Sequence, residues 1–139
     1  MNKKVLQLDI FHSQSINPTY EIKRALRQSL SKTHLSRDQV VDAMNNIARH
    51  EGMRKSISKA TLDNWLKDSD PDRLPSLPWL VIFCRVVNDV SPITVLLRPL
   101  GHYLIDERGK ALLDWAEAEM NRRQATKRAK NALAIAEEY

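Results

Sequence analysis

Helix-start signals recur along this chain and leave little room for anything but α-helices between them. They are Asn17-Pro18, Ser36 with Gln39, Ser58, Ser76, Ser91-Pro92 and Asp106. Ser, Asn and Asp side chains accept hydrogen bonds from the unpaired N–H groups of a first helical turn, and proline suits the first helical position. Three glycines and six prolines are too few for the many turns of a sandwich or barrel. We therefore predict an all-α fold.

Apolar residues follow these signals at helical spacing and predict helices over 18–32, 37–49, 58–67, 77–87 and 91–97. We expect the five helices to form one helix-turn-helix domain over 18–105, with Tyr103, Leu104 and Ile105 packed on its edge. Residues 1–17 are expected to form an N-terminal arm or one edge strand. The predicted core faces are Ile22, Ala25, Leu26, Leu30; Val40, Val41, Met44, Ile47, Ala48; Ile57, Leu62, Trp65, Leu66; and Leu77, Leu80, Val81, Cys84, Val87. The opposite face of the first helix carries Lys23, Arg24, Arg27 and Gln28 and is expected to be solvated.

The last part of the chain, 106–139, has a different pattern. After the capping residue Asp106 it contains no proline and one glycine, which predicts a single helix about 45 Å long. A heptad stripe of mostly small residues runs along it: Ala111, Trp115, Ala118, Arg122, Ala125, Ala129, Ala132 and Ala136. Such a stripe is typical of a coiled coil, so we predict homo-oligomerisation through Ala111, Trp115, Ala118, Ala125, Ala129, Ala132 and Ala136. The alternative is a solvated single helix, since Ala, Glu, Lys and Arg are good helix formers by themselves.

Positive charge is concentrated in the first half of the chain. The formal net charge is +5, whereas residues 1–67 carry twelve Lys and Arg against six Asp and Glu, a net charge of +6. A basic half on a neutral remainder indicates a polyanionic partner. A lysine-rich soluble surface is the alternative.

The predicted helices over 37–49 and 58–67 meet the requirements of a DNA-reading helix-turn-helix, in which the second helix exposes its N-terminal end to base edges. Its expected exposed residues are Ser58, Lys59, Ala60, Thr61, Asp63, Asn64 and Lys67. Lys can donate to guanine, Asn can pair with adenine, and Ala and the Thr methyl can touch a thymine methyl. We therefore assign Lys59, Ala60, Thr61 and Asn64 to base contact. Phosphate contacts are assigned to Ser58, Lys67, Arg54, Lys55 and Arg37.

The stretch from Leu35 to Met44, followed by Ile57 to Trp65, resembles the helix-turn-helix of phage-repressor (Cro/C1-like) domains. The five-helix layout with Ser91-Pro92 before the fifth helix is similar too. More narrowly, the chain, including Asp106-Glu107-Arg108 at the start of its last helix, resembles small helix-turn-helix proteins of transposable (Mu-like) phages and prophages. The resemblance covers about residues 20–115 and implies a DNA-binding phage regulator. One departure is the longer connection over 45–56, because the family's turn has three or four residues with a glycine.

No arrangement of residues typical of an enzyme, a metal site or a cofactor site appears in the sequence. Asp68, Asp70 and Asp72 imitate the first ligands of a calcium loop, but Arg73 and Trp79 stand where glycine and glutamate are needed. The single Cys84 lies in an apolar run and is expected to be a packed thiol. We predict no enzymatic activity, no metal and no cofactor. One cysteine and the lack of a long apolar segment favour a soluble protein in the cytoplasm.

The favoured function is an oligomeric, sequence-specific regulator of phage or prophage transcription that binds double-stranded DNA in the bacterial cytoplasm. Two alternatives remain open, a small terminase-like DNA-packaging subunit and a phage adaptor that binds a host protein. The basic run Arg122, Arg123, Lys127, Arg128 and Lys130 is interpreted either as a second DNA contact or as the solvated face of a coiled coil.

Overall fold

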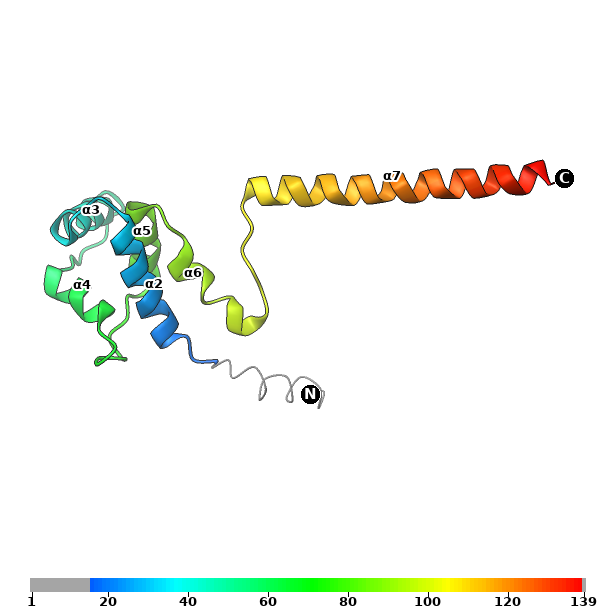
Figure 1. Cartoon of the computed structure of the whole chain (residues 1–139). Coiled ribbons are helices and arrows are strands. Elements are labelled where there is room, and N and C mark those ends of the chain that lie inside the picture. Colours follow the sequence, from blue (N-terminus) through cyan, green and yellow to red (C-terminus); the bar gives the residue numbers. More distant parts are fainter. Residues whose placement is uncertain (1–15, 139) are drawn as a thin grey trace. The chain divides into compact units, whose positions relative to one another are not determined.

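The computed structural model describes residues 16–138 and contains no strand within them (Figure 1), so the predicted all-α fold is confirmed. Its elements are α2 (Thr19–Lys32), α3 (Arg37–His50), α4 (Lys59–Leu66), α5 (Leu77–Val87), α6 (Ser91–Thr94), the short 3₁₀ helix η1 (Arg98–Leu100) and α7 (Glu107–Glu137). The chain divides into two compact units, the first ending at Tyr103 and the second beginning at Leu104. Of the expected N-terminal arm, residues 1–15 lie outside the described part of the chain.

The first unit is built around one hydrophobic core. Helix α2 packs against α4 and α6, α3 packs against α4 and α5, and α5 packs against α6. The buried apolar side chains are Ile22, Ala25, Leu26, Val40, Val41, Met44, Ala48, Ile57, Leu62, Trp65, Leu66, Trp79, Leu80, Ile82, Phe83, Cys84, Val87 and Val95. The predicted core faces of α2, α3 and α4 are largely confirmed, with Leu30 and Ile47 partly buried at the margin.

Several predicted helix caps are present as hydrogen bonds. The Ser36 hydroxyl accepts from the Gln39 N–H at 3.2 Å and the Gln39 side chain accepts from the Ser36 N–H at 2.9 Å, which makes a reciprocal capping box. The Asp106 carboxylate accepts from the Gly109 N–H at 2.7 Å and starts α7. Gly52 follows α3 with a φ of 77°, the left-handed conformation that favours glycine at a helix end.

The predicted core face of α5 is confirmed for Leu80, Cys84 and Val87 but was wrong for Leu77 and Val81. Leu77 and Val81 are 72% and 58% exposed, whereas Ile82 and Phe83 enter the core. The run is apolar almost throughout, so the hydrophobic pattern alone does not select a face. The one charged residue, Arg85, follows Val81 by four positions and therefore marks the solvent side of the helix.

Two expectations for the end of the first unit also need correction. Helix α6 ends at Thr94 rather than at residue 97, because the backbone continues with the tighter bonds Leu96 N–H to Ile93 and Leu97 N–H to Thr94. The segment from Tyr103 to Ile105, expected to be packed, is not buried. Its three side chains are exposed, and Tyr103 is 79% exposed.

Asp89 joins α2 to α6 through a short network. One carboxylate oxygen accepts from the Ser91 N–H at 2.9 Å and from the Ser91 hydroxyl at 2.6 Å, and the other accepts from the Ser29 hydroxyl at 2.9 Å. These donors, the Ser91 hydroxyl first, lower the pKa of Asp89 below its ordinary value. Ser29 is buried, so the network satisfies a hydroxyl inside the core.

Cys84 is a buried thiol, as predicted. Burial, reinforced by the charge of Asp89, raises its pKa to about 11. The thiol is therefore protonated near neutral pH and packs as a small apolar side chain.

Candidate nucleic-acid interface

Helix α4 has one buried face and one exposed end. Leu62, Trp65 and Leu66 are buried in the core, as predicted. Ser58 and the first turn residues Lys59 and Ala60 are exposed. A base-reading helix presents its N-terminal end to DNA in the same way.

Thr61 and Asn64 lie differently from the prediction. Both, like Asp63, are half-buried rather than exposed. The Ser58 hydroxyl accepts from the Thr61 N–H at 3.1 Å and lies 3.0 Å from the Thr61 hydroxyl, so the two hydroxyls already share a hydrogen bond. A phosphate contact by Ser58 would therefore exploit the remaining hydrogen-bonding capacity of a capping residue.

Asn45 of α3 anchors the chain just before α4. Its side-chain oxygen accepts from the Ile57 N–H at 2.9 Å, and its side-chain nitrogen donates to the Ile57 carbonyl at 2.8 Å. These two bonds pair both backbone polar groups of a buried residue, which would otherwise cost free energy. The two bonds thus attach the end of the longer connection between α3 and α4 to α3. They fix the position of Ser58, where α4 begins.

Ion pairs between α3 and α4 also align the exposed face. Arg37 Nη1 lies 2.7 Å from Asp63 Oδ1, and Lys59 Nζ lies 3.8 Å from Asp38 Oδ2. All four side chains are at least partly exposed, so each pair is worth only a fraction of 1 kcal/mol. Their effect on the site is to partly neutralise Arg37, which was assigned to a phosphate, and to direct Lys59 towards α3.

Two cations from α2 hold the other end of α4. The Lys23 ammonium donates to the carbonyls of Asn64, Trp65 and Arg73 at 3.1, 3.0 and 2.9 Å. Arg27 donates to the Leu66 carbonyl at 2.8 Å and to the Asp68 carboxylate at 2.9 Å. The last carbonyls of a helix have no partner within it and carry partial negative charge, so these cations satisfy and stabilise the end of α4.

Lys23 was expected on a solvated face, but it is fully buried. Burial lowers the pKa of Lys23 because it disfavours the charged form, while Asp70 and Asp68 act in the opposite direction. All three ammonium donors have carbonyl partners, which is the condition under which a buried charge is tolerated.

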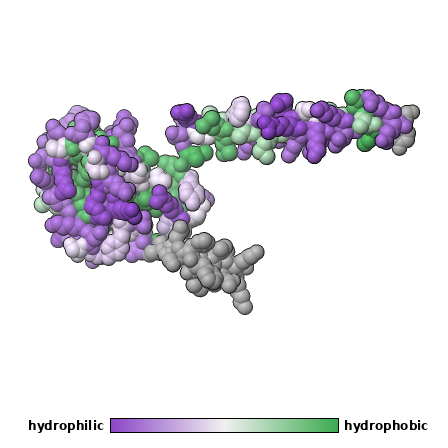
Figure 2. All heavy atoms as spheres, in the orientation of Figure 1, coloured by the Kyte–Doolittle hydropathy of each residue, from purple (hydrophilic) through white to green (hydrophobic). Residues whose placement is uncertain are grey.

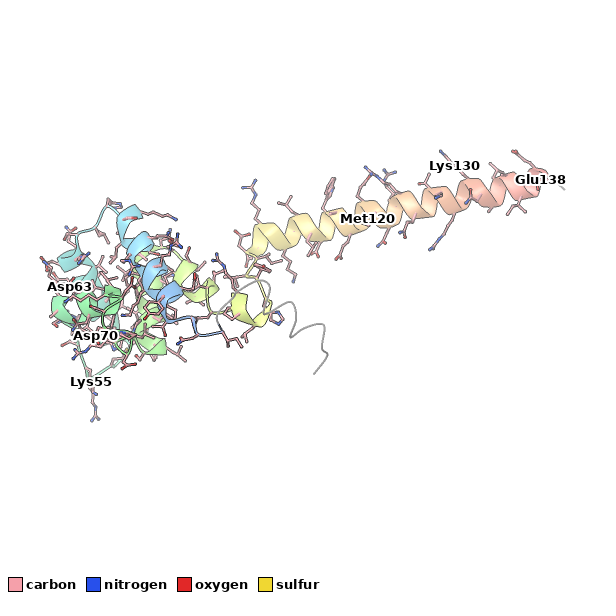
Figure 3. The ribbon with its side chains drawn as sticks, turned by 60° about the horizontal axis from the view of Figure 1, so that its bottom comes forward. Lys55, Asp63, Asp70, Met120, Lys130 and Glu138 are labelled. Carbon is pink, nitrogen blue, oxygen red and sulfur yellow. The ribbon has the colours of Figure 1, made fainter. Side chains whose placement is uncertain are left out.

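The connection over 51–57 supplies exposed positive charge. Arg54 and Lys55 are both exposed, and Figure 3 shows the Lys55 side chain pointing away from the body of the domain. Lys67, directly after α4, is exposed as well. Among the described residues none of these three forms an ion pair, so their charge is available to a polyanion.

The residues that hold α4 in place, Lys23 and Asn45, were not predicted from the sequence. At about 100° per residue, Lys23 lies only about 20° from Leu30 around α2, and Asn45 lies about 40° from Val41 around α3. A polar side chain beside an apolar stripe is partly buried and needs a hydrogen-bond partner from another element. Their position beside the stripe could therefore have indicated that both residues bind a neighbouring helix.

The predicted oligomerisation stripe lies on α7. Its residues Ala111, Trp115, Ala118, Ala125, Ala129, Ala132 and Ala136 are all exposed, and Trp115 is 67% exposed. Larger exposed apolar side chains lie near the start of the helix (Leu112 and Leu113), near its middle (Met120) and near its end (Leu133 and Ile135). The stripe residues are thus not buried within α7's own unit.

None of the described helices is both long and apolar enough to cross a membrane. Within residues 16–138 there is also no group of three His, Cys, Asp or Glu side chains that could hold a metal ion. Comparisons with protein-family models, with curated proteins and with solved structures found no match. The function must therefore be inferred from the chemistry of α4, its basic connection and α7.

Proposed function

We propose that this protein is a sequence-specific, double-stranded DNA-binding regulator of phage or prophage transcription that acts as an oligomer in the bacterial cytoplasm. The proposal rests on how α4 is held in the fold. Its C-terminal carbonyls are held by Lys23 and Arg27, and the chain before it is held by Asn45, while its first turn stays exposed. A helix that reads bases needs this combination, because its side chains must be positioned before contact.

The exposed residues divide into two roles. Lys59, Ala60, Thr61 and Asn64 would face base edges in the major groove, where Lys donates to guanine and Asn pairs with adenine. Arg54, Lys55 and Lys67, with Ser58 and Arg37, would contact phosphates and set the register of α4. Oligomerisation through α7 would bring two copies to adjacent half-sites, as in symmetric helix-turn-helix dimers.

The test begins with selection of a preferred duplex from a random pool by the full-length protein. Affinity for this duplex and for a random one is then measured by fluorescence anisotropy. Lys59→Ala and Asn64→Ala should lower the ratio of the two affinities about 5- to 150-fold, the value of one good base contact. Lys32→Ala, an exposed lysine at the end of α2, serves as the charge-matched control.

Arg54→Ala and Lys55→Ala should weaken binding to both duplexes alike and reduce the dependence of log Kd on log salt by about 1 each. Equal binding of the selected and random duplexes by wild type and all variants would refute sequence reading by α4.

Measurement of mass in solution addresses the assembly. A dimer or tetramer agrees with regulation, whereas a closed ring of many copies would favour the packaging-subunit alternative. Complete absence of DNA binding at low salt, with a host protein co-purifying, would favour the adaptor.

A further inference from the structure

The neutral total charge of residues 106–139 hides a strong separation of charge along α7. Between Glu119 and Glu137 there is no Asp or Glu, yet this interval holds five cations: Arg122, Arg123, Lys127, Arg128 and Lys130. Figure 2 shows a strongly hydrophilic surface along the middle of α7, with hydrophobic surface near its start and its end. A helix segment of this kind has no internal counter-charge over most of its length.

The ion pairs of α7 leave most of this charge unneutralised. The Glu119 carboxylate forms ion pairs with Arg122 at 2.6 Å and with Arg123 at 3.5 Å. In the described part of the chain, no other carboxylate pairs with any of the five cations. Lys127, Arg128 and Lys130 have no ion-pair partner among the described residues, and all are exposed. Like charges three or four positions apart on a helix repel each other, so an external anion would relieve this segment.

Three of the five cations lie on one side of the helix, whereas Arg122 and Arg128 lie towards the alanine stripe. At about 100° per residue, Arg123, Lys127 and Lys130 fall within a sector of about 60° and span about 10 Å of helix length. The opposite side carries Ala125, Ala129 and Ala132, part of the alanine stripe. Figure 3 shows the Lys130 side chain projecting outward from α7. One side of the helix can thus meet a polyanion while the other remains available to a second copy.

The chemistry of the segment distinguishes between polyanions. A helix that lies on an anionic membrane needs large apolar side chains opposite its cations, and 121–132 contains none. Duplex DNA offers a continuous array of phosphates and requires no apolar face. We propose that residues 121–131 of α7 form a second contact surface that binds the phosphate backbone of duplex DNA without reading its sequence. The choice of DNA as the polyanion rests on the proposed function.

The test uses the full-length protein and a random-sequence duplex. Lys127→Gln and Lys130→Gln are combined in one variant, and Arg108→Gln with Lys110→Gln form the matched control at the start of the same helix. Both variants lose two positive charges, and Gln has nearly the same helix propensity as Lys and Arg. Equal helix content by circular dichroism confirms that α7 is intact in both.

If each lysine neutralises one phosphate, the slope of log Kd against log salt should fall by about 1.8 in the K127Q/K130Q variant and change little in the control. Affinity near 0.15 M salt should fall by roughly tenfold or more. Equal slopes for the two variants overturn the inference. So does unchanged DNA binding together with lysine-dependent sedimentation on phosphatidylserine vesicles.

This experiment separates the two proposals. A reduced salt slope in the K127Q/K130Q variant supports the α7 contact even if Lys59→Ala leaves sequence discrimination unchanged, which would count against α4. Conversely, an unchanged slope overturns the α7 contact even if Lys59→Ala abolishes discrimination.

Discussion

Replacing Asn45 with alanine should remove both hydrogen bonds that hold Ile57 against α3. These bonds, at 2.8 and 2.9 Å, pair the carbonyl and the N–H of a buried residue. A typical hydrogen bond contributes about 1 kcal/mol, and a buried group left unpaired costs about 1–3 kcal/mol. Alanine recovers about 0.5 kcal/mol through its higher helix propensity. The expected net loss in the free energy of unfolding is about 2 kcal/mol.

Asn46 provides the matched control for this change. It is the next residue of the same helix, it is exposed, and its side chain forms no hydrogen bond in the described part of the chain. Asn46→Ala should therefore leave stability unchanged or raise it by about 0.5 kcal/mol.

Urea unfolding followed by tryptophan emission measures this difference. Trp65 and Trp79 are buried in the first unit, whereas Trp115 on α7 is largely exposed already, so the signal change reports the core. With an ordinary urea dependence, a loss of about 2 kcal/mol moves the midpoint down by about 1 M. Equal midpoints for Asn45→Ala and Asn46→Ala would show that the two bonds to Ile57 contribute nothing and would refute the reasoning.

Two further predictions concern the contacts between helices. Lys23→Met should lower the free energy of unfolding by about 2 kcal/mol because the carbonyls at the end of α4 lose their donors, whereas Arg24→Met, on the exposed side of α2, should change it by less than about 0.5 kcal/mol; equal urea midpoints would mean that desolvation of the lysine cancels its hydrogen bonds. The folded-state pKa of Asp89 lies below its ordinary 3.8, so its contribution is complete above that value and is lost as pH falls through the folded pKa. The stability difference between wild type and Asp89→Asn should therefore shrink on acidification below about pH 4, and a difference that does not vary between pH 2 and pH 6 would contradict this assignment.

Several helix boundaries could be predicted because their signals are local, whereas Ser76 and Ser91 form no side-chain cap bond and α6 ends earlier than expected. Ser36 with Gln39, Ser58 and Asp106 each cap a helix within three residues of themselves, and Gly52 ends α3. A cap needs only the backbone that follows it, so no other element has to be known.

The buried faces were predictable only where polar residues interrupt the apolar pattern. In α3 and α4 they do, and Val40, Met44, Leu62 and Trp65 are buried as expected. In α5 the apolar run is nearly continuous, and the choice between Val81 and Phe83 depends on how α3 and α6 pack against the helix. One polar residue in an apolar run does not determine which face of the helix is buried, so tertiary packing decides it.

In the candidate site, too, local features could be predicted and contacts between helices could not. Residue type and helical spacing were enough to predict that α4 has a buried stripe and an exposed, polar N-terminal end. They were not enough to predict how α4 is held, because Lys23 and Asn45 reach carbonyl and N–H groups 12 to 50 positions away in the chain. Those partners exist only once α2, α3 and α4 are packed, since a buried polar group is satisfied by whatever the assembled fold brings beside it.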